Sequence, residues 1–457
     1  MKDKKIRRLR EGAKDLLIVV LALSAIYLAF RAQLVNFDFT NVSGGWLGSV
    51  IQLLGGRTEQ ILSPPETQEP RTVPVYPARI VVTSSNLSRN GVQYNNAAAD
   101  ELFSGVFSVL GEALSTAGSP GAATEAQWQN ALSQRPGIYF DFLGAYPLET
   151  LLAWLEEDGG NLALTGTARR LLLADNGEGE AVLYYQEASN GRFYACTTSS
   201  AVDNHLLTAV EGWGSNSLEY AFEYGDAQGF ENLDPYVLLD AQPPQPQVYQ
   251  VYNALGTITD QTQLRALLAS MEALRFQSQT GTPYQPNDRE WVVNDDQGQL
   301  RIGSDGTIRF RTDSTEDPCY PVNQAGEEPT ATELLDAVQP IAAGTIGAWC
   351  GEARLYLISL EHLPDGSWQV DFGYTLNGAP VYVMGEEQCA RFLIRSGAVT
   401  EYTMCLRTYT ATGETTSILP ERQAAAALAA LDAQGRELTL CYEDNGGDTV
   451  RAGWIAR

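Results

Sequence analysis

The sequence predicts an α+β fold, in which an N-terminal single transmembrane helix is followed by extracytoplasmic mixed α/β modules built from helices packed on antiparallel β-meanders. Two patterns predict the modules. Apolar residues recur at helical spacing in several stretches, and short apolar runs are joined by turns rich in Gly, Asn and Asp, as in β-hairpins. A length of 457 residues is about three times that of a usual domain, so more than one folded unit is expected.

The charges of the chain divide near its N-terminus. All four lysines lie within the first fourteen residues, and residues 1–15 carry 7 basic and 3 acidic side chains, a net charge of +4. The remaining residues carry 23 basic and 53 acidic side chains, a net charge of −30. So acidic a body is a poor nucleic-acid binder, because contacts with phosphates need clustered Lys and Arg. No nucleic-acid partner is therefore expected.

Fifteen uncharged residues, 16–30, separate the two charge regimes. A helix over this run would span roughly 22 Å, less than the ~30 Å hydrocarbon core, but a further apolar stretch follows Arg31. We interpret residues 16–39 as an uncleaved transmembrane anchor in the cell membrane; a cleaved signal peptide and a buried core helix are the alternatives. The basic flank predicts that residues 1–15 form a cytoplasmic tail and that the acidic body is extracellular.

One face of this helix carries small residues. Ala22, Ala25 and Ala29 follow one another at helical spacing, and Ala25-xxx-Ala29 fits the small-xxx-small pattern that lets a second transmembrane helix approach closely. The alternative is ordinary alanine usage in an anchor. We take the three alanines as the candidate helix-packing face.

After a Pro/Gly-rich stalk (40–75), residues 76–240 are predicted to form a mixed α/β extracellular domain. Its longest helix, 95–117, has apolar residues at helical spacing, and Pro147 occupies a favoured first-turn position in another. The predicted elements are strands at 78–84, 137–142, 181–187, 192–198 and 217–224, and helices at 95–117, from 124, at 147–157 and near 203–212.

The clearest linker, AQPPQPQ at 241–247, precedes two helix-plus-strand modules. The first module, 248–312, has a helix at 260–274 and a three-stranded meander at 290–311. The second, 330–457, contains Asn377-Gly378, a strong hairpin signal. Its predicted elements are helices at 331–342 and 420–431, and strands at 354–360, 367–376, 379–384, 390–396, 399–410, 438–444 and 449–456.

Residues that carry chemistry are sparse. Neither histidine lies in a metal-binding or catalytic motif. Asp203-Asn204-His205 offers an acid–imidazole pair, but a helix N-terminus capped by Asp203 is the simpler interpretation, and we take His362 as a surface residue. The sequence contains no G-x-S-x-G, P-loop or S-x-x-K motif. We therefore predict no catalytic residue, no metal and no cofactor.

Acidic turns and cysteines leave alternatives open. The turns at 294–296 and 444–448 have calcium-type side chains without the full calcium loop, so turn chemistry explains them as well. Paired carboxylates suited to glycoside hydrolysis stay open, because so many acidic residues produce accidental pairs. Six cysteines in an exported chain permit disulfides, and we expect one or two at most.

Several stretches, in this order, resemble the YycH/YycI regulatory proteins of Firmicutes. They are PGIYFDFLGAYPLETLLAWL, then LRFQSQTGTPYQPNDREWVVNDDQGQLRIGSDGTIRF, VDFGYTLNGAPVYV and SILPERQAAAAL, and a final strand ending in GWIA. The resemblance implies a single-pass membrane protein with extracytoplasmic α/β modules, associated with the YycG sensor histidine kinase that governs cell-wall metabolism. It does not distinguish a YycH-like from a YycI-like protein.

The resemblance implies a non-enzymatic regulator of two-component signalling. Its expected partners are the membrane, a sensor histidine kinase and a second YycH/YycI-like protein, contacted through the anchor and the external modules. The alternatives are an anchored extracytoplasmic cell-wall enzyme of the carboxylate type, and a passive wall- or ligand-binding module. The signal sensed, the direction of regulation and the oligomeric state stay open.

Overall fold

The computed structural model describes residues 75–457 except for short gaps, at 156–159, 217, 229, 231–232, 241–242, 277–281, 297, 313–317, 324–327 and 430–436. Residues 1–74 lie outside the described part of the chain. They include the predicted tail (1–15), the predicted anchor (16–39) and all but the last residue of the predicted stalk (40–75). Within the described ranges, no helix is both long enough and apolar enough to cross a membrane.

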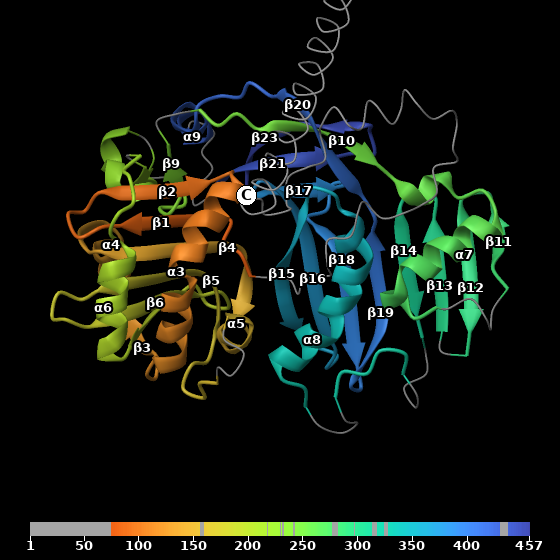
Figure 1. Ribbon diagram of the computed structural model, residues 1–457, viewed down its shortest axis with the longest axis horizontal. Helices are drawn as coiled ribbons and strands as arrows, with labels where there is room; N and C mark the ends of the chain where they lie inside the picture. Colours follow the sequence, from red (N-terminus) through yellow and green to blue (C-terminus); the bar gives the residue numbers. More distant parts are fainter. Residues whose placement is uncertain are drawn as a thin grey trace, which may run out of the picture. The chain divides into compact units, whose positions relative to one another are not determined.

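The first sheet has antiparallel neighbours throughout, in the order β2-β1-β4-β5-β6-β7-β3. It is drawn in orange to olive in Figure 1. Its strands are β1 (Arg79–Thr83), β2 (Arg89–Gln93), β3 (Gly121–Ala123), β4 (Gly137–Pro147), β5 (Thr167–Asp175), β6 (Ala181–Glu187) and β7 (Phe193–Thr197).

Helices cover both faces of this sheet. Because successive strand residues point to opposite faces, β4 sends Ile138 and Phe140 into one apolar cluster and Tyr139 into another. The helices α3 (Asn96–Thr116), α5 (Leu148–Leu155) and α6 (Ser200–Ala209) contribute to the first cluster, and α4 (Glu125–Gln134) contributes Trp128 to the second. The sheet is therefore the middle layer of a three-layer arrangement.

Local signals explain where these helices begin. Asn95 caps α3 by accepting the backbone N–H of Ala98 at 3.2 Å. Thr124 and Gln127 form a reciprocal capping box at the start of α4. The predicted helices at 95–117, from 124 and at 147–157 are thus confirmed to within a few residues.

The second sheet unites strands from 284–311 with strands from the C-terminal part of the chain. Its order is β11-β12-β13-β14-β19-β18-β16-β17-β21-β23, with β15 paired to β16. Every neighbouring pair is antiparallel except β17 and β21. The strands are β11 (Tyr284–Asn287), β12 (Glu290–Asp295), β13 (Gly298–Gly303), β14 (Thr307–Arg311), β15 (Arg354–His362), β16 (Trp368–Leu376), β17 (Ala379–Val383), β18 (Gln388–Arg395), β19 (Ala398–Cys405), β21 (Leu438–Asp444) and β23 (Ala452–Ala456).

Three of the described helices pack against the second sheet, and one of them, α9 (Glu421–Ala429), packs on β21. The helix α8 (Ala331–Ala342) packs on β16, β18 and β19, and α7 (Gln261–Ser270) adds its buried leucines to the apolar cluster that also contains the buried side chains of β12 to β14 (Figure 1). Two small sheets complete the fold. They are β20 (Thr408–Thr415), β10 (Gln247–Tyr252) and β22 (Thr449–Val450), and the pair β8 (Glu219–Tyr220) and β9 (Leu238–Leu239). Helices packed on antiparallel sheets confirm the predicted α+β class.

Three predicted strands differ from the structure. Residues 449–456 form two strands, β22 (Thr449–Val450) and β23, which belong to different sheets. Residues 217–224 give only the two-residue strand β8, because a 3₁₀ helix (Ala221–Gln228) follows and the Glu223 carboxylate accepts the backbone N–H of Tyr220 at 2.9 Å. The predicted strand 399–410 is two strands in different sheets. Between them, the side chain of Arg407 turns inward and lies 3.2 Å from the buried carboxylate of Asp444.

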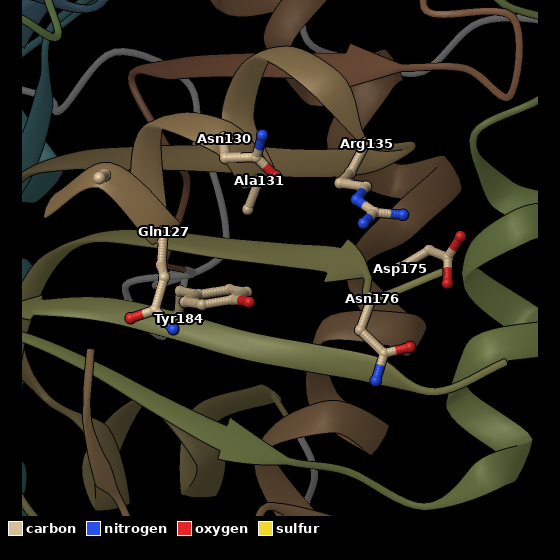
Figure 2. A pocket seen from close by; sticks show the side chains of 8 residues that line it. Gln127, Asn130, Ala131, Arg135, Asp175, Asn176 and Tyr184 are labelled. Carbon is tan, nitrogen blue, oxygen red and sulfur yellow. The ribbon is translucent and has the colours of Figure 1, made fainter. Parts of the chain in front are cut away.

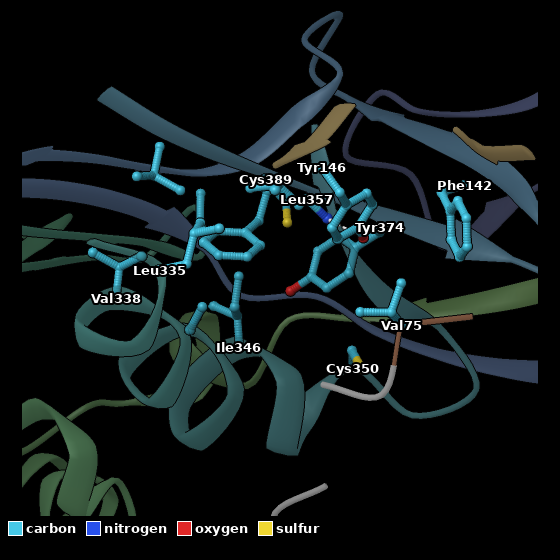
Figure 3. Close-up of a cluster of buried hydrophobic side chains, with 14 of the residues drawn as sticks. Val75, Phe142, Tyr146, Leu335, Val338, Ile346, Cys350, Leu357, Tyr374 and Cys389 are labelled. Carbon is cyan, nitrogen blue, oxygen red and sulfur yellow. Dashed lines mark hydrogen bonds between the residues drawn. The ribbon is translucent and has the colours of Figure 1, made fainter. Parts of the chain in front are cut away.

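The two large sheets meet along β4 and β15. The Tyr146 hydroxyl accepts the backbone N–H of Leu357 at 3.1 Å. Gly144 approaches the backbone of Leu357 so closely that a Cβ atom there would lie 1.5 Å from its carbonyl oxygen. Figure 3 shows that Tyr146 and Leu357 lie in one cluster with apolar side chains of α8 and β16.

Candidate functional site

Only some of the sequence-derived candidates lie among the described residues. The proposed helix-packing face, Ala22, Ala25 and Ala29, lies outside the described residues. Asp203 does not cap α6; it is buried in the first turn, and its Oδ1 has no hydrogen-bond partner among the described residues. His205 pairs instead with Glu112 of α3, at 2.5 Å between Nδ1 and Oε2, with 59% of the imidazole side chain exposed.

The remaining polar candidates have structural partners. His362 packs on the Trp368 ring, with ring centroids 4.5 Å apart. Asp444 is fully buried and accepts the Tyr409 hydroxyl at 2.9 Å, as well as contacting Arg407. In the described part of the chain, no group of His, Cys, Asp and Glu side chains is arranged to hold a metal ion.

All six cysteines are free thiols in the structure. Burial raises the pKa of Cys196 to about 11 and the pKa of both Cys350 and Cys441 to about 12. The thiolate, which is the nucleophilic form, is therefore scarce near neutral pH at these three residues. They behave as small apolar side chains of the core.

A buried ion network links the first sheet to the C-terminal part of the chain. Arg79 of β1 bonds Asp141 of β4 at 3.1 Å and Glu437 at 2.6 Å. Arg169 of β5 makes two bonds to each of these carboxylates, all between 2.7 and 2.8 Å. Arg170 lies beside them and bonds Asp234 at 3.1 Å. Opposite charges within this network are thus compensated by direct contact.

The arginines determine the ionisation of the network. Burial alone would raise the pKa of Asp141, but Arg169 and Arg79 outweigh it and hold that pKa at about 2. The same two arginines hold the pKa of Glu437 well below its usual range, against the opposing effect of burial. Both carboxylates are therefore charged at neutral pH and fix the start of β21 against β1, β4 and β5.

The pKa of Glu421, at the start of α9, is raised, whereas the pKa values of Asp141 and Glu437 are lowered. Glu421 is 2% exposed, and its carboxyl accepts the Gln93 side-chain amide at 2.7 Å and the backbone N–H of Asp240 at 2.5 Å. Burial, with a smaller contribution from the Asp240 carboxylate, raises the pKa of Glu421 to about 8, although the Asp240 N–H and the charge of Arg79 oppose the rise. Glu421 is therefore largely protonated at neutral pH.

This pKa shift predicts a pH-dependent stability. A carboxyl whose pKa rises from 4.5 in the unfolded chain to about 8 stabilises the fold fully at low pH, and this contribution is lost as the pH rises through that interval. We expect Glu421→Gln, which keeps a neutral side chain of the same shape, to gain stability relative to wild type between about pH 5 and pH 8, by up to about 1.4 kcal/mol per pH unit. Urea unfolding at several pH values measures the difference. A constant difference across that range would show that Glu421 is already ionised in the fold.

A polar pocket of about 270 Å³ lies between α4 and the turn that joins β5 to β6 (Figure 2). α4 contributes Gln127 and Asn130 from consecutive turns, and Arg135 is the C-cap residue of this helix. Tyr184 of β6 lies opposite, and Asp175 and Asn176 close one end. The turn is held by the Asp175 carboxylate, which accepts the backbone N–H of Gly177 at 2.7 Å.

Sequence reasoning did not find this pocket. Its residues come from α4 and the residue after it, from the end of β5 and the following turn, and from β6, so no spacing along the chain marks them. The one local signal is the Asn-Gly-Glu-Gly segment after Asp175, which indicates a turn but not its proximity to α4.

Comparisons with known proteins bear on the fold. Neither a family model nor a curated protein matches the sequence. The structure is similar to the crystal structure of YycH from Bacillus subtilis, with a TM-score of 0.50 and 13% sequence identity, over 86% of this chain and 96% of that chain. The likeness shows a YycH-like fold, in agreement with the predicted resemblance to the YycH/YycI proteins.

Proposed function

We propose that this protein is a membrane-anchored, extracytoplasmic and non-enzymatic regulator of a cell-wall-associated sensor histidine kinase. The observation that carries the proposal is the structural likeness to YycH, which extends over 96% of that chain. The order of a basic tail, an apolar run and an acidic body in the sequence supports the anchored topology. A second YycH/YycI-like protein is a further expected partner.

In this proposal the protein acts through binding alone. A regulator that binds one conformation of a kinase better than another shifts the population by its differential affinity. A coupling of about 1–3 kcal/mol corresponds to a change of about 5- to 150-fold in the equilibrium between the two states. The anchor contributes by packing laterally on a transmembrane helix of the kinase, and the external domains contribute by contacting its sensor domain.

The anchored hydrolase gains no support from the carboxyl whose pKa is the most clearly raised. A general acid must reach its substrate, whereas Glu421 is 2% exposed and its two oxygens are occupied by Gln93 and the backbone of Asp240. The raised pKa of Glu421 reflects its burial at the start of α9.

The anchor face gives a direct test of the proposed function. We expect Ala25→Leu combined with Ala29→Leu to lower the amount of kinase that co-purifies with the full-length chain by at least fivefold, because bulky side chains separate closely packed helices. Kinase-dependent reporter output should change with it. The matched control is Val20→Leu, which lies on the opposite side of an ideal helix.

Both variants should unfold at the same denaturant concentration as wild type, which shows that the external body is intact. Unchanged co-purification and unchanged reporter output in the double variant would contradict the role of the anchor face. Equal losses in the double variant and the Val20 control would show that the effect is not specific to the face.

A further inference from the structure

Arg135 is exceptional among the arginines of the described ranges. All lysines of the chain lie in the first fourteen residues, so arginine supplies every basic side chain of the described residues except the two histidines. Arg135 is half-buried, yet it has no acidic or hydrogen-bonding partner within the described ranges. Each of the other buried or half-buried arginines there contacts a carboxylate: Arg79, Arg89, Arg169, Arg170, Arg354, Arg391, Arg407 and Arg422.

The walls of the pocket keep this guanidinium in place. The turn after β5 packs directly on it, since a Cβ atom on Gly177 would lie 2.1 Å from its Nη1. Gly177 also has a φ of +81°, which favours glycine, so the turn is built for this close approach. Tyr184 lies near enough for the charge of Arg135 to lower its pKa, against a larger rise from burial. A half-buried guanidinium that makes no ion pair is a ready site for an anion.

The other residues that line the pocket indicate which class of anion it binds. Asp175 lines the same pocket without an ion pair to Arg135, so a positive and a negative group face one small volume. The carboxylate disfavours a phosphate dianion, but it accepts an N–H group well. Asn130 has no hydrogen-bond partner in the described ranges, and the NH₂ group of Gln127 is free of the capping box, which uses its oxygen. These amides suit a peptide group.

We propose that this pocket binds the free carboxylate end of a short peptide. The carboxylate contacts Arg135, the N–H of the same residue contacts Asp175, and the preceding peptide group contacts Asn130 or Gln127. A volume of about 270 Å³ accommodates one or two small residues. The inference goes beyond the proposed function, and it does not depend on a kinase.

Binding of N-acetyl-alanyl-alanine to the full-length chain tests the proposal, by saturation-transfer NMR and titration calorimetry. A ligand of this size should bind with a dissociation constant on the order of 1 mM. The same dipeptide with a C-terminal amide should bind at least tenfold more weakly, because it lacks the charge that Arg135 recognises.

Two substitutions complete the test. Arg135→Gln should weaken binding of the free acid at least tenfold and leave the binding of the amide unchanged. Arg192→Gln, which alters an exposed arginine outside the pocket, should bind the free acid as wild type does. Unfolding midpoints equal to that of wild type confirm that both variants fold.

Three results would overturn the assignment. The first is equal affinity for the free acid and the amide, and the second is unchanged affinity for the free acid in Arg135→Gln. The third is displacement of the dipeptide by inorganic phosphate at a concentration below the dissociation constant of the dipeptide. The assignment would also be overturned if no binding were detected at a dipeptide concentration 20 times the expected dissociation constant.

Discussion

Replacing Asp141 by Asn is expected to lower the free energy of unfolding by about 3–5 kcal/mol. The Asp141 side chain is 1% exposed and bonds both Arg79 and Arg169. The amide keeps the shape of the side chain but removes the charge, so two buried guanidinium groups lose part of their compensation. Urea or guanidinium unfolding of the two proteins at neutral pH measures the difference.

The pKa of Asp141 also predicts how the loss of stability in Asp141→Asn depends on pH. Because its pKa is held at about 2 in the fold and is 3.8 in the unfolded chain, its contribution is present above about pH 4 and is lost as the pH falls toward 2. The difference between wild type and Asp141→Asn should therefore shrink in acid. The matched control is Asp365→Asn, whose carboxylate is 58% exposed and lies 3.8 Å from Arg395; it should cost far less than Asp141→Asn, because water screens an exposed ion pair. Equal costs at the two sites would contradict the account of the network.

Gly144→Ala is expected to have the second large effect, a loss of about 3 kcal/mol or more. Overpacking typically costs about 1–3 kcal/mol when side chains can move aside. Here the added methyl group would lie 1.5 Å from the Leu357 carbonyl oxygen, which is part of a strand and cannot rotate away. β4 and β15 would have to separate, and the Tyr146 hydrogen bond to the backbone of Leu357 would be lost with them.

Hydrogen exchange locates the damage caused by Gly144→Ala. Amides of β4 and β15 should exchange faster than in wild type, whereas amides of β6 and β12, far from the junction in either sheet, should change least. Gly214→Ala is the control, because a Cβ atom there has no neighbour within 4 Å and its φ is not positive. Unchanged stability and exchange in Gly144→Ala would mean that the two sheets do not meet as described.

Elements with local signals could be predicted from the sequence. The helices α3, α4 and α8 carry both an apolar stripe and a capping residue, and the capping box of Thr330 and Glu333 is visible in the sequence itself. The Asn377-Gly378 turn likewise gave the hairpin of β16 and β17, with Asn377 and Gly378 both at positive φ.

Elements defined by distant partners could not be predicted. β5 was missed because Arg169 and Arg170 interrupt its apolar run, and their burial makes sense only beside Asp141 and Glu437, the latter 268 positions from Arg169. The pairing of β14 with β19 is equally non-local. Boundaries of the modules at 76–240, 248–312 and 330–457 stay a prediction.

The same reasoning explains which parts of the sites were found. Arg135 looks in the sequence like any surface arginine at a helix end, and only the structure reveals that the turn after β5 packs on it without an ion pair. The sequence favours Asp203 as a helix cap over an Asp203–His205 pair, and the structure has neither, because His205 pairs with Glu112 of another helix. Periodicity identifies the face on which a residue lies and not the residue that it meets.

Photo-crosslinking in native membranes tests the central proposal most directly. A photoreactive amino acid replaces Ala22 or, as the control, Val20 in the full-length chain, and adducts are identified by mass spectrometry. We expect the sensor kinase to be captured from position 22 and at least fivefold less from position 20, because only position 22 lies on the face of small residues. Absence of kinase adducts from both positions, or equal capture from both, would contradict lateral packing of the anchor on the kinase.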